Sequence, residues 1–571
     1  MIISSLEIRN FRGIDIVVEE IDSIVTLIGQ NDSGKSNLCA AILKVLDFDK
    51  RKIPLQENDS TMCNRGDIFI KIGLEIVDLT NEQLAIVHEI IHEKNGKKYI
   101  YAQLTSKFNS DVLIYEDELL LGDPDVDSKE YNVIRQNPID KILSIVYINP
   151  TYDTKVETRN FFQYKEKKHI EENKKLSEDF EKAIEALNVN VKNEEALSEI
   201  LDDINNLGKF EKMFDGLTFE LSPNIRLDNI YKSLEISTLD NNGNILSNIG
   251  DGKSKIFSML LKEKTYNDER KKIFIVEEPE NHLYVLLQKY YIDSILSFDP
   301  CQMIVTTHSP YVVDFEKTNQ IIKIEKYYDN TLLQYKRRKY LYNVNNEEFK
   351  KYGYLLNVEI AEMMYYDKVL LIEGESEKYF YSYLLSSDQS FRDYVFENRI
   401  GIFNVNGISF ENTKTLLESL GVKVYLKTDN DIFKVPRQPK KIYAGITRCI
   451  KYLNSSSKIA LQNILGFENL NINNFKFSEE DDSIDIIEEK MNDICILFKE
   501  NGILFSKHHL GFECDFLDFI SYTGEDYMDV LEDLKQAKLM NLHEFICDND
   551  IILSINDSNK SSVLVEFINN D

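Results

Sequence analysis

The chain has 571 residues, enough for several domains, and its 43% hydrophobic and 29% charged content is ordinary for a globular protein. It has no apolar stretch of membrane-spanning length and no signal-peptide pattern at its N-terminus, so we expect a cytoplasmic protein without a membrane segment. The seven cysteines include no Cys-x-x-Cys pair, which argues against a disulfide framework or zinc ribbon. The net charge of −30 argues against broad electrostatic adhesion to nucleic acid.

A phosphate-binding loop follows the first strongly apolar run. Residues 29–36 read Gly-Gln-Asn-Asp-Ser-Gly-Lys-Ser, between the apolar segment 24–28 and a helical pattern at 37–43. The G-x-x-x-x-G-K-S motif requires this strand–loop–helix context, in which the lysine reaches the β- and γ-phosphates and the serine holds Mg²⁺. We therefore expect nucleotide binding through Asn31, Gly34, Lys35 and Ser36.

A competing motif lies further along the same half. Residues 88–92 read His-Glu-Ile-Ile-His, a literal H-E-x-x-H, which on one helix could bind zinc with Glu89 as the base. No third ligand follows at an obvious spacing. We therefore expect a short helix with partly exposed histidines.

A change of character marks the middle of this half. From about 160 to 213 the chain is highly charged, with apolar residues at helical spacing, such as Leu176, Phe180, Ile184 and Leu187. This pattern predicts a helical insertion, at about 155–235, whose use is helix-on-helix pairing within or between chains.

A second apolar run ends in two carboxylates. Residues 271–276 are followed by Glu277, placed where a metal-associated carboxylate belongs, and Glu278, placed where a base could polarise an attacking water. This predicts the acidic part of an ATPase site.

Two weaker signals flank that run. Residues 304–307 form an apolar strand that ends in His308, positioned to sense a γ-phosphate. The glycine-rich segment 247–254 precedes a helix, so amides around Gly250 and Gly252 could bind phosphate from the other side.

In this order, these motifs resemble the ABC-type ATPases of the recombination and chromosome-maintenance group. The opening strand carries that group's Asn-Phe-Arg at residues 10–12. The resemblance implies an ATPase domain over 1–335 and ATP held between two heads, hence a dimer. Glu277 stands where aspartate is usual, and the signature is reduced to Ile-Gly-Asp-Gly at 249–252, which predicts weak ATP hydrolysis with binding retained.

The second half begins after a polar, tyrosine-rich stretch that we take as a linker, 336–365. The apolar run 368–372 ends in Glu373, with Glu377 one helical turn further on. Another run, 424–428, ends in Asp429 and Asp431. Because the carboxyl ends of adjacent parallel strands converge at one edge of a sheet, these oxygen ligands predict a Mg²⁺ or Mn²⁺ site that acts on phosphate.

These acidic strand ends resemble the Toprim domain, which we place at 366–571. Downstream, Glu513 and Asp515 could complete a two-metal clamp, and Lys538 could neutralise charge in the transition state. The predicted fold class is therefore α/β, an ABC-type ATPase domain with a helical dimerisation insertion followed by a C-terminal Toprim domain.

An ABC-type ATPase followed by this Toprim half resembles the OLD (overcoming lysogenization defect) nuclease family, and within it the Gabija-type anti-phage defence nucleases. The matching segments are 146–150, 277–280, 307–310, 371–374, 427–431 and 538–539. The resemblance implies a metal-dependent endonuclease that nicks or cuts duplex DNA, restrained by its ATP-sensing domain. It also implies a dimer or tetramer and a helicase-like partner subunit. The implied metal ligands are Glu373, Glu377, Asp429, Asp431, Glu513 and Asp515, and the implied catalytic lysine is Lys538.

Two alternatives remain. The first is an ATP-driven DNA-binding clamp or repair-type ATPase whose Toprim domain is structural, although a scaffold has no physical need for three acidic strand ends. The second concerns the basic residues between Lys423 and Lys451, which are either a DNA track or, as we favour, a solvated face.

Overall fold

The computed structural model describes most of the chain outside the middle of the first half. The described ranges are 1–123, 125–149, 269–297, 299–314, 317–329, 334–344, 358–405, 410–434, 440–467, 475–478, 483–506, 508 and 511–569, with a few isolated positions between 150 and 268. The predicted insertion at about 155–235 lies almost wholly outside these ranges, as does Gly250. Among the described residues, no helix combines the length and apolarity needed to cross a bilayer.

The chain forms two compact units. The first consists of Met1–Leu27, Gly34–Thr307 and Tyr328–Arg337, and the second of Ile28–Ser33, His308–Tyr327 and Arg338–Asp571.

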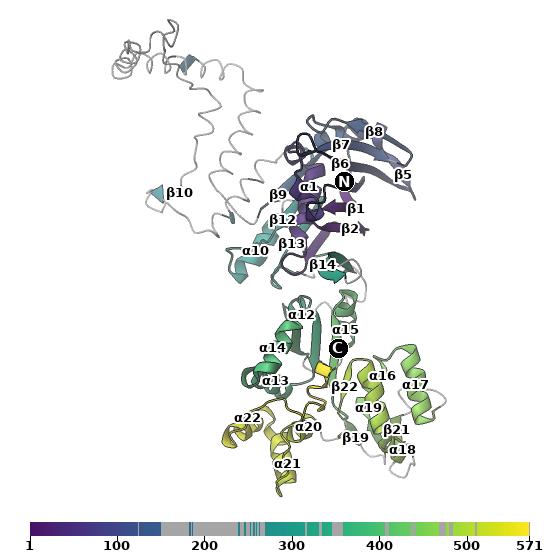
Figure 1. Ribbon diagram of the computed structural model, residues 1–571, viewed down its shortest axis with the longest axis vertical. Coiled ribbons are helices and arrows are strands. Elements are labelled where there is room, and N and C mark those ends of the chain that lie inside the picture. Colours follow the sequence, from purple (N-terminus) through teal and green to yellow (C-terminus); the bar gives the residue numbers. More distant parts are fainter. Residues whose placement is uncertain are drawn as a thin grey trace. The chain divides into compact units, whose positions relative to one another are not determined.

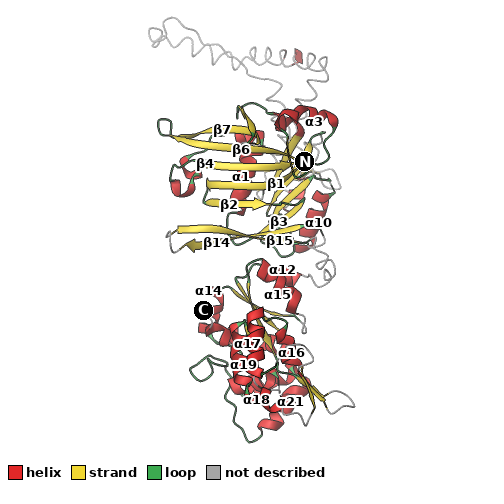
Figure 2. Ribbon diagram, turned by 90° about the vertical axis from the view of Figure 1, so that its right-hand side faces the viewer, coloured by secondary structure: helices red, strands yellow, loops and turns green. Residues whose placement is uncertain are grey.

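A seven-stranded antiparallel sheet, in the order β2-β1-β4-β6-β7-β8 with β5 beside β6, forms one layer of the first unit (Figure 2). Its strands are β1 (Ile2–Phe11), β2 (Ile14–Glu19), β4 (Ile68–Glu75), β5 (His92–Lys94), β6 (Lys97–Asn109), β7 (Ile114–Asp123) and β8 (Asp127–Tyr131). Alternate residues of β4, including Ile68, Ile70 and Ile72, are fully buried, so one face of this sheet packs on the core.

The other sheet has six strands, of which β14 (Gln320–Asp329) and β15 (Gln334–Asn343) continue it beyond β3, and the remaining four are parallel. They are β9 (Leu143–Ile148), β12 (Lys271–Glu277), β13 (Gln302–Thr306) and β3 (Ile24–Ile28), paired in that order. The helices around the two sheets are α1 (Lys35–Leu46), α2 (Phe48–Arg51), α3 (Asn81–Val87), α4 (Pro138–Ile142) and α10 (Val285–Leu296). Strands β12 and β13 are buried along nearly their whole length, as expected for a parallel sheet covered on both faces. Their carboxyl ends bring Glu277 level with Thr306.

The H-E-x-x-H segment does not form a zinc-binding helix. Helix α3 ends at Val87, His88 begins a short 3₁₀ turn, and His92 starts strand β5. The two histidines therefore do not share one helical face, and Glu89 forms an ion pair with Lys129 at 2.6 Å. This agrees with the expected short helix rather than with a metalloprotease site.

The expected linker contains regular structure. Strands β14 (Gln320–Asp329) and β15 (Gln334–Asn343) have residues in both units, and β15 takes in positions 336–343 of that linker. Helix α12 (Val358–Met363) takes in a further part. This segment mixes tyrosines with basic residues and has no apolar run, so composition alone does not separate such a strand from a loop.

A four-stranded parallel sheet, in the order β17-β16-β18-β22, organises the second unit. Figure 1 labels its strand β22 and several of the helices in this unit. Its strands are β16 (Lys368–Ile372), β17 (Ile400–Asn404), β18 (Lys423–Thr428) and β22 (Ile503–Phe505). Val369 and Leu371 point into one hydrophobic cluster, whereas Leu370 and Ile372 point into another, so helices cover both faces.

The first cluster packs against helices α12, α15 (Phe410–Ser419), α16 (Ala444–Ile450), α17 (Ser455–Leu465) and α19 (Met491–Glu500). The second packs against α13 (Glu375–Ser387), α14 (Gln389–Glu397), α20 (Phe512–Phe519), α21 (Tyr527–Ala537) and α22 (Leu539–Asp548). A small antiparallel sheet of β19 (Ile432–Lys434), β20 (Lys440–Tyr443) and β21 (Lys476–Ser478) and helix α18 (Ser483–Glu489) complete the unit.

Candidate active site

The phosphate-binding loop leads directly into helix α1. Gly34 immediately precedes the helix with a φ of 107°, and Gly29 has a φ of 149°. A Cβ atom on Gly29 would overlap the carbonyl oxygen of Ile324, so glycine is required there for a close backbone approach. Lys35 and Ser36 form the first residues of the helix, which is the placement that a phosphate-binding motif needs.

Glu277 is a buried carboxylate at the carboxyl end of β12. The Tyr147 hydroxyl donates a hydrogen bond to its Oε2 atom at 3.0 Å. Burial raises the pKa of Glu277, which Lys35 opposes electrostatically. A buried carboxylate at this strand end suits the predicted metal-associated position.

Glu278 has a strained backbone with a φ of 43°. Its N–H donates to the Thr306 carbonyl at 2.9 Å, and the Asn281 side chain donates to its carboxylate at 2.8 Å. Strain in a non-glycine residue is typical of functional positions. Lys255, just after the glycine-rich segment, donates to the Glu278 carbonyl at 3.0 Å, and burial lowers the pKa of Lys255 to about 8.

The remaining nucleotide-site candidates are less informative. Gly252 occupies a helical position where a Cβ would lie 2.9 Å from the His282 carbonyl oxygen, so a glycine allows close packing there. His308 follows Thr307 just beyond β13 and is partly exposed. Their proposed phosphate contacts remain predictions.

The acidic residues of the second half gather at the carboxyl edge of the parallel sheet. Glu373 follows β16, and Asp429 and Asp431 follow the neighbouring strand β18. Arg448 on α16 donates from Nη1 to Glu373 and from Nη2 to Asp431, each at 2.6 Å. The Thr428 hydroxyl also hydrogen-bonds to Glu373. The structure thus brings these two carboxylates to one guanidinium.

Glu377 lies in the first turn of helix α13, and its side chain folds back to the end of β16. Its Oε2 atom accepts hydrogen bonds from the backbone N–H groups of Glu373 at 2.7 Å and Gly374 at 3.0 Å, which form a capping interaction. Its buried Oε1 atom has no hydrogen-bond partner, and its nearest cation is Lys427, 3.9 Å away. Burial therefore raises the pKa of Glu377 to about 8.

Lys427 is a fully buried lysine at the centre of this cluster. Its Nζ atom lies 3.0 Å from Asp429 Oδ1 and 3.0 Å from Asp515 Oδ2. The three surrounding carboxylates raise the pKa of Lys427 well above its ordinary value, although burial alone would lower it. The same ammonium holds the pKa of Asp429 below its usual range against the opposing effect of burial.

The basic residues between Lys423 and Lys451 do not form one exposed track. Lys427 and Arg448 are buried among the carboxylates, so their charges serve the acidic cluster rather than DNA. Sequence reasoning missed both roles. A lysine inside the apolar strand β18 was the available signal for Lys427, whereas nothing in the sequence singled out Arg448.

Helix α20 supplies the second acidic set. Gly511 precedes it with φ 80° and ψ −166°, and a Cβ atom on Gly511 would lie 3.2 Å from Asp429 Oδ2. The Phe512 N–H donates to Asp429 at 3.3 Å, and the Ser506 hydroxyl donates to Asp515 at 2.7 Å. Helix α20 is thereby fastened to the strand ends.

Glu513 and Lys538 lie at the edge of the same cluster. Burial raises the pKa of Glu513, Asp429 raises it further, and the charge of Lys538 opposes both. Lys538 itself lies between α21 and α22 with a φ of 35°. The structure therefore places all six carboxylates and the lysine in one electrostatic neighbourhood.

The cluster suits hard divalent cations. Its ligand atoms are carboxylate oxygens, which Mg²⁺ and Mn²⁺ prefer. The buried Glu377 Oε1 atom has no hydrogen-bond partner, so a bound cation could satisfy it. Glu373, Glu377, Asp429, Asp431, Glu513 and Asp515 are the residues that could hold such ions.

Two family models match this chain. Residues 24–314 match the "AAA domain, putative AbiEii toxin, Type IV TA system" model. Residues 364–431 match the "Overcoming lysogenization defect protein-like, TOPRIM domain" model, which spans Glu373 through Asp431.

A curated relative matches almost the whole chain. It is Endonuclease GajA from Bacillus cereus (strain VD045), 24% identical over 585 residues, which span 95% of this chain and 94% of the relative.

Solved structures of chromosome-maintenance ATPase heads also match. An SmcHead bound to the C-winged helix domain of ScpA is 16% identical, with a TM-score of 0.35, and covers 62% of this chain and 100% of its own. An Smc head with an extended coiled coil, bound to the C-terminal domain of ScpA derived from Pyrococcus furiosus, is 15% identical, with a TM-score of 0.33, and covers 62% and 99%. Because these TM-scores are below 0.5, the assignment rests on the family models.

Proposed function

Because this chain belongs to the OLD family of ATPase–Toprim nucleases, we propose that it is a nucleotide-regulated, metal-dependent DNA endonuclease of Gabija-type anti-phage defence. The observation that carries this proposal is the gathering of Glu373, Asp429 and Asp515, with their acidic neighbours, at the carboxyl edge of the Toprim sheet.

The carboxylates would bind Mg²⁺ or Mn²⁺, which supply an activated water and stabilise the leaving oxygen of a phosphodiester. Glu373 and Asp431 must first release Arg448, and Glu377 must lose its proton, before their oxygens can act as ligands. The buried Lys427 fixes the positions of Asp429 and Asp515 through its two ion pairs. Lys538 would neutralise charge that develops on the scissile phosphate.

The ATPase half would act as a sensor rather than a motor. Lys35 and Ser36 would hold the nucleotide phosphates and Mg²⁺, with Asn31, Gly34, Gly250, Gly252 and His308 as further contacts. Glu278 would be the base that activates water, but Glu277 in place of the usual aspartate and the reduced signature at 249–252 would make hydrolysis slow or absent. Bound ATP would restrain cleavage. We further propose that the ATPase domain spans 1–335 and the Toprim domain spans 366–571. The chain would form a dimer or tetramer partly through the insertion, and it would act with a helicase subunit of the GajB type.

Replacing Glu373 tests the nuclease site directly. We expect Glu373→Ala to reduce nicking of a supercoiled plasmid in Mg²⁺ or Mn²⁺ by at least about 100-fold, because a metal ligand is lost. The exposed Glu544→Ala variant, on helix α22, is the matched control and should cleave like the wild type. Equal nicking by wild type and Glu373→Ala would contradict the proposal and favour the alternative, an ATP-dependent DNA clamp with a structural Toprim domain.

Replacing Lys35 separates sensing from cutting. We expect Lys35→Ala to bind ATP poorly, measured by calorimetry, because the β- and γ-phosphates lose their ammonium partner. The variant should keep its cleavage activity but lose most of the inhibition by ATP. Cleavage that stays fully sensitive to ATP would count against the sensor role.

A further inference from the structure

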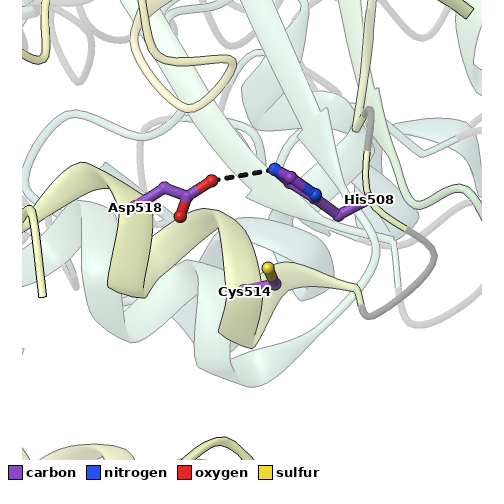
Figure 3. A group of neighbouring side chains, drawn as sticks. All are labelled: His508, Cys514 and Asp518. Carbon is purple, nitrogen blue, oxygen red and sulfur yellow. Dashed lines mark ion pairs between the residues drawn. The ribbon is translucent and has the colours of Figure 1, made fainter. Parts of the chain in front are cut away.

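Helix α20 and the loop before it bring together a second group of side chains with metal-ligand chemistry, apart from the carboxylates of the proposed nuclease site. His508, Cys514 and Asp518 each offer a ligand atom, and these atoms all lie within 4.8 Å of one another. His508 and Asp518 point toward each other, and the Cys514 sulfur points toward the gap between them (Figure 3). Among the described residues this is the one group of histidine, cysteine and carboxylate side chains with that spacing.

The local fold explains this convergence. Cys514 and Asp518 are four residues apart on α20, so they lie on the same side of the helix. His508 comes from the loop before the helix, and its Nε2 atom lies 2.8 Å from Asp518 Oδ2. Cys514 is 3% exposed, whereas about half of each of the other two side chains is exposed. An ion could therefore enter from solvent at His508 and Asp518 and bind the buried sulfur of Cys514.

A cavity of about 450 Å³ lies beside the His508–Asp518 pair. His508, Asp515 and Asp518 all line it, between α19, β22 and the C-terminal turns. A hydrated cation can therefore reach the His508–Asp518 pair without crossing the core.

We propose that His508, Cys514 and Asp518 form a zinc site that is distinct from the nuclease metal site. Imidazole nitrogen, thiolate sulfur and carboxylate oxygen are the three ligand types of zinc in proteins, and three of them leave one tetrahedral position to water. The thiolate selects Zn²⁺ over Mg²⁺ or Mn²⁺, whereas the all-oxygen nuclease cluster has the opposite preference. The two sites therefore take different metals.

The zinc site would fix the position of the acidic helix. The Ser506 hydroxyl accepts a hydrogen bond from the His508 N–H at 3.2 Å and donates one to Asp515 at 2.7 Å. A zinc ion bound by both His508 and Cys514 would add a second link between this loop and helix α20. Zinc binding would thus hold the start of α20, where Glu513 and Asp515 lie, in place.

Metal analysis of the full-length protein tests this without DNA or ATP. After chelation, reloading with Zn²⁺ and dialysis against Mg²⁺, we expect close to one zinc per chain in the wild type. His508→Gln and Asp518→Asn should each weaken zinc binding by at least about tenfold. Because both side chains are half-exposed, these variants should fold even if the buried Cys514→Ser variant does not.

A second cysteine that lies next to a histidine, Cys547, provides the matched control. Cys547 lies 3.8 Å from His543 Nε2 on α22 and is exposed, so Cys547→Ser should retain zinc. Cobalt(II) should give a thiolate charge-transfer absorption in the wild type and Cys547→Ser but not in Cys514→Ser, and Zn²⁺ should raise the Tm of the wild type but not of His508→Gln. Wild-type protein without stoichiometric zinc, or His508→Gln with unchanged affinity, would overturn the proposal. Neither result depends on the nuclease function.

Discussion

At the scale of single residues, the acidic cluster is organised by two buried cations. Arg448 joins Glu373 to Asp431, and Lys427 lies between Asp429 and Asp515. Strand-end geometry in the sequence was enough to predict the carboxylates. The cations could not be predicted in their roles, because a lysine or arginine among polar neighbours is usually solvated and its partner is set by tertiary packing.

Glu377 gives the cluster a dependence on pH. Its pKa is raised by burial to about 8 from 4.5, so the folded state binds a proton that the unfolded state releases between these values. In the metal-free protein, this proton adds to the free energy of unfolding. The contribution is fully present below pH 4.5 and is lost as the pH rises through 8.

The variant Glu377→Gln isolates this effect. Glutamine keeps an oxygen that can accept the two backbone hydrogen bonds but carries no charge, so we expect metal-free Glu377→Gln to match the wild type in Tm near pH 5. Near pH 8 it should be more stable by about 1 kcal/mol or more. Thermal melts in EDTA across this range are the measurement. A difference in Tm that shrinks as the pH rises would contradict the raised pKa.

At the scale of elements, the site depends on where helices meet strand ends. The sequence predicted that the apolar runs ending at Glu373 and Asp429 are adjacent parallel strands whose carboxyl ends converge, and β16 and β18 do pair in parallel. It did not predict the positions of β17 and β22 in this sheet. The start of α20 was harder to predict, because its position depends on one glycine with φ 80° and ψ −166°, a conformation that residues with a side chain rarely adopt. The strand at 334–343 was missed because its residues are polar and basic.

Gly511→Ala tests the junction at α20. A Cβ there meets both an unfavourable backbone conformation and the Asp429 carboxylate, so we expect a loss of about 1–3 kcal/mol in stability and a marked loss of Mn²⁺ affinity. Calorimetry and thermal melts measure the two effects.

Gly466→Ala is the control for backbone strain. Gly466 has a φ of 70° at the end of α17, and a Cβ there would meet no atom within 4 Å. It should lose stability but keep its metal affinity. If both variants bind Mn²⁺ like the wild type, the close approach of Gly511 to Asp429 has no role in the site.

At the scale of the whole molecule, a short chain of contacts inside the second unit joins the phosphate loop to the acidic cluster. The Gln30 side chain donates to Asp367 at 2.9 Å. Asp367 directly precedes β16, the strand that ends at Glu373, and its carbonyl accepts the Lys423 N–H at the start of β18. The motifs at both ends of this path were predicted from the sequence, but the path was not, because it depends on residues 337 positions apart.

Asp367→Ala should therefore weaken the inhibition of cleavage by ATP that we propose. We expect the ratio of cleavage without and with ATP to fall by about fivefold or more, with ATP affinity unchanged, because the coupling contact is lost and the phosphate contacts are kept. Arg399→Ala, which removes a cation 3.8 Å from the same carboxylate but keeps the Gln30 contact, is the control. An unchanged ratio in Asp367→Ala would show that regulation travels by another route.

The buried ammonium of Lys427 also bears on whether the chain can fold before it binds metal. A site of carboxylates alone would repel itself until cations arrived, and the chain would need metal in order to fold. Here the counter-charges are encoded in the polypeptide, so the carboxylates can assemble during biosynthesis in a metal-poor setting. The divalent ion that we propose for this site would then be a late and exchangeable ligand. Chelators should silence such an enzyme reversibly, without sending it back to the unfolded chain.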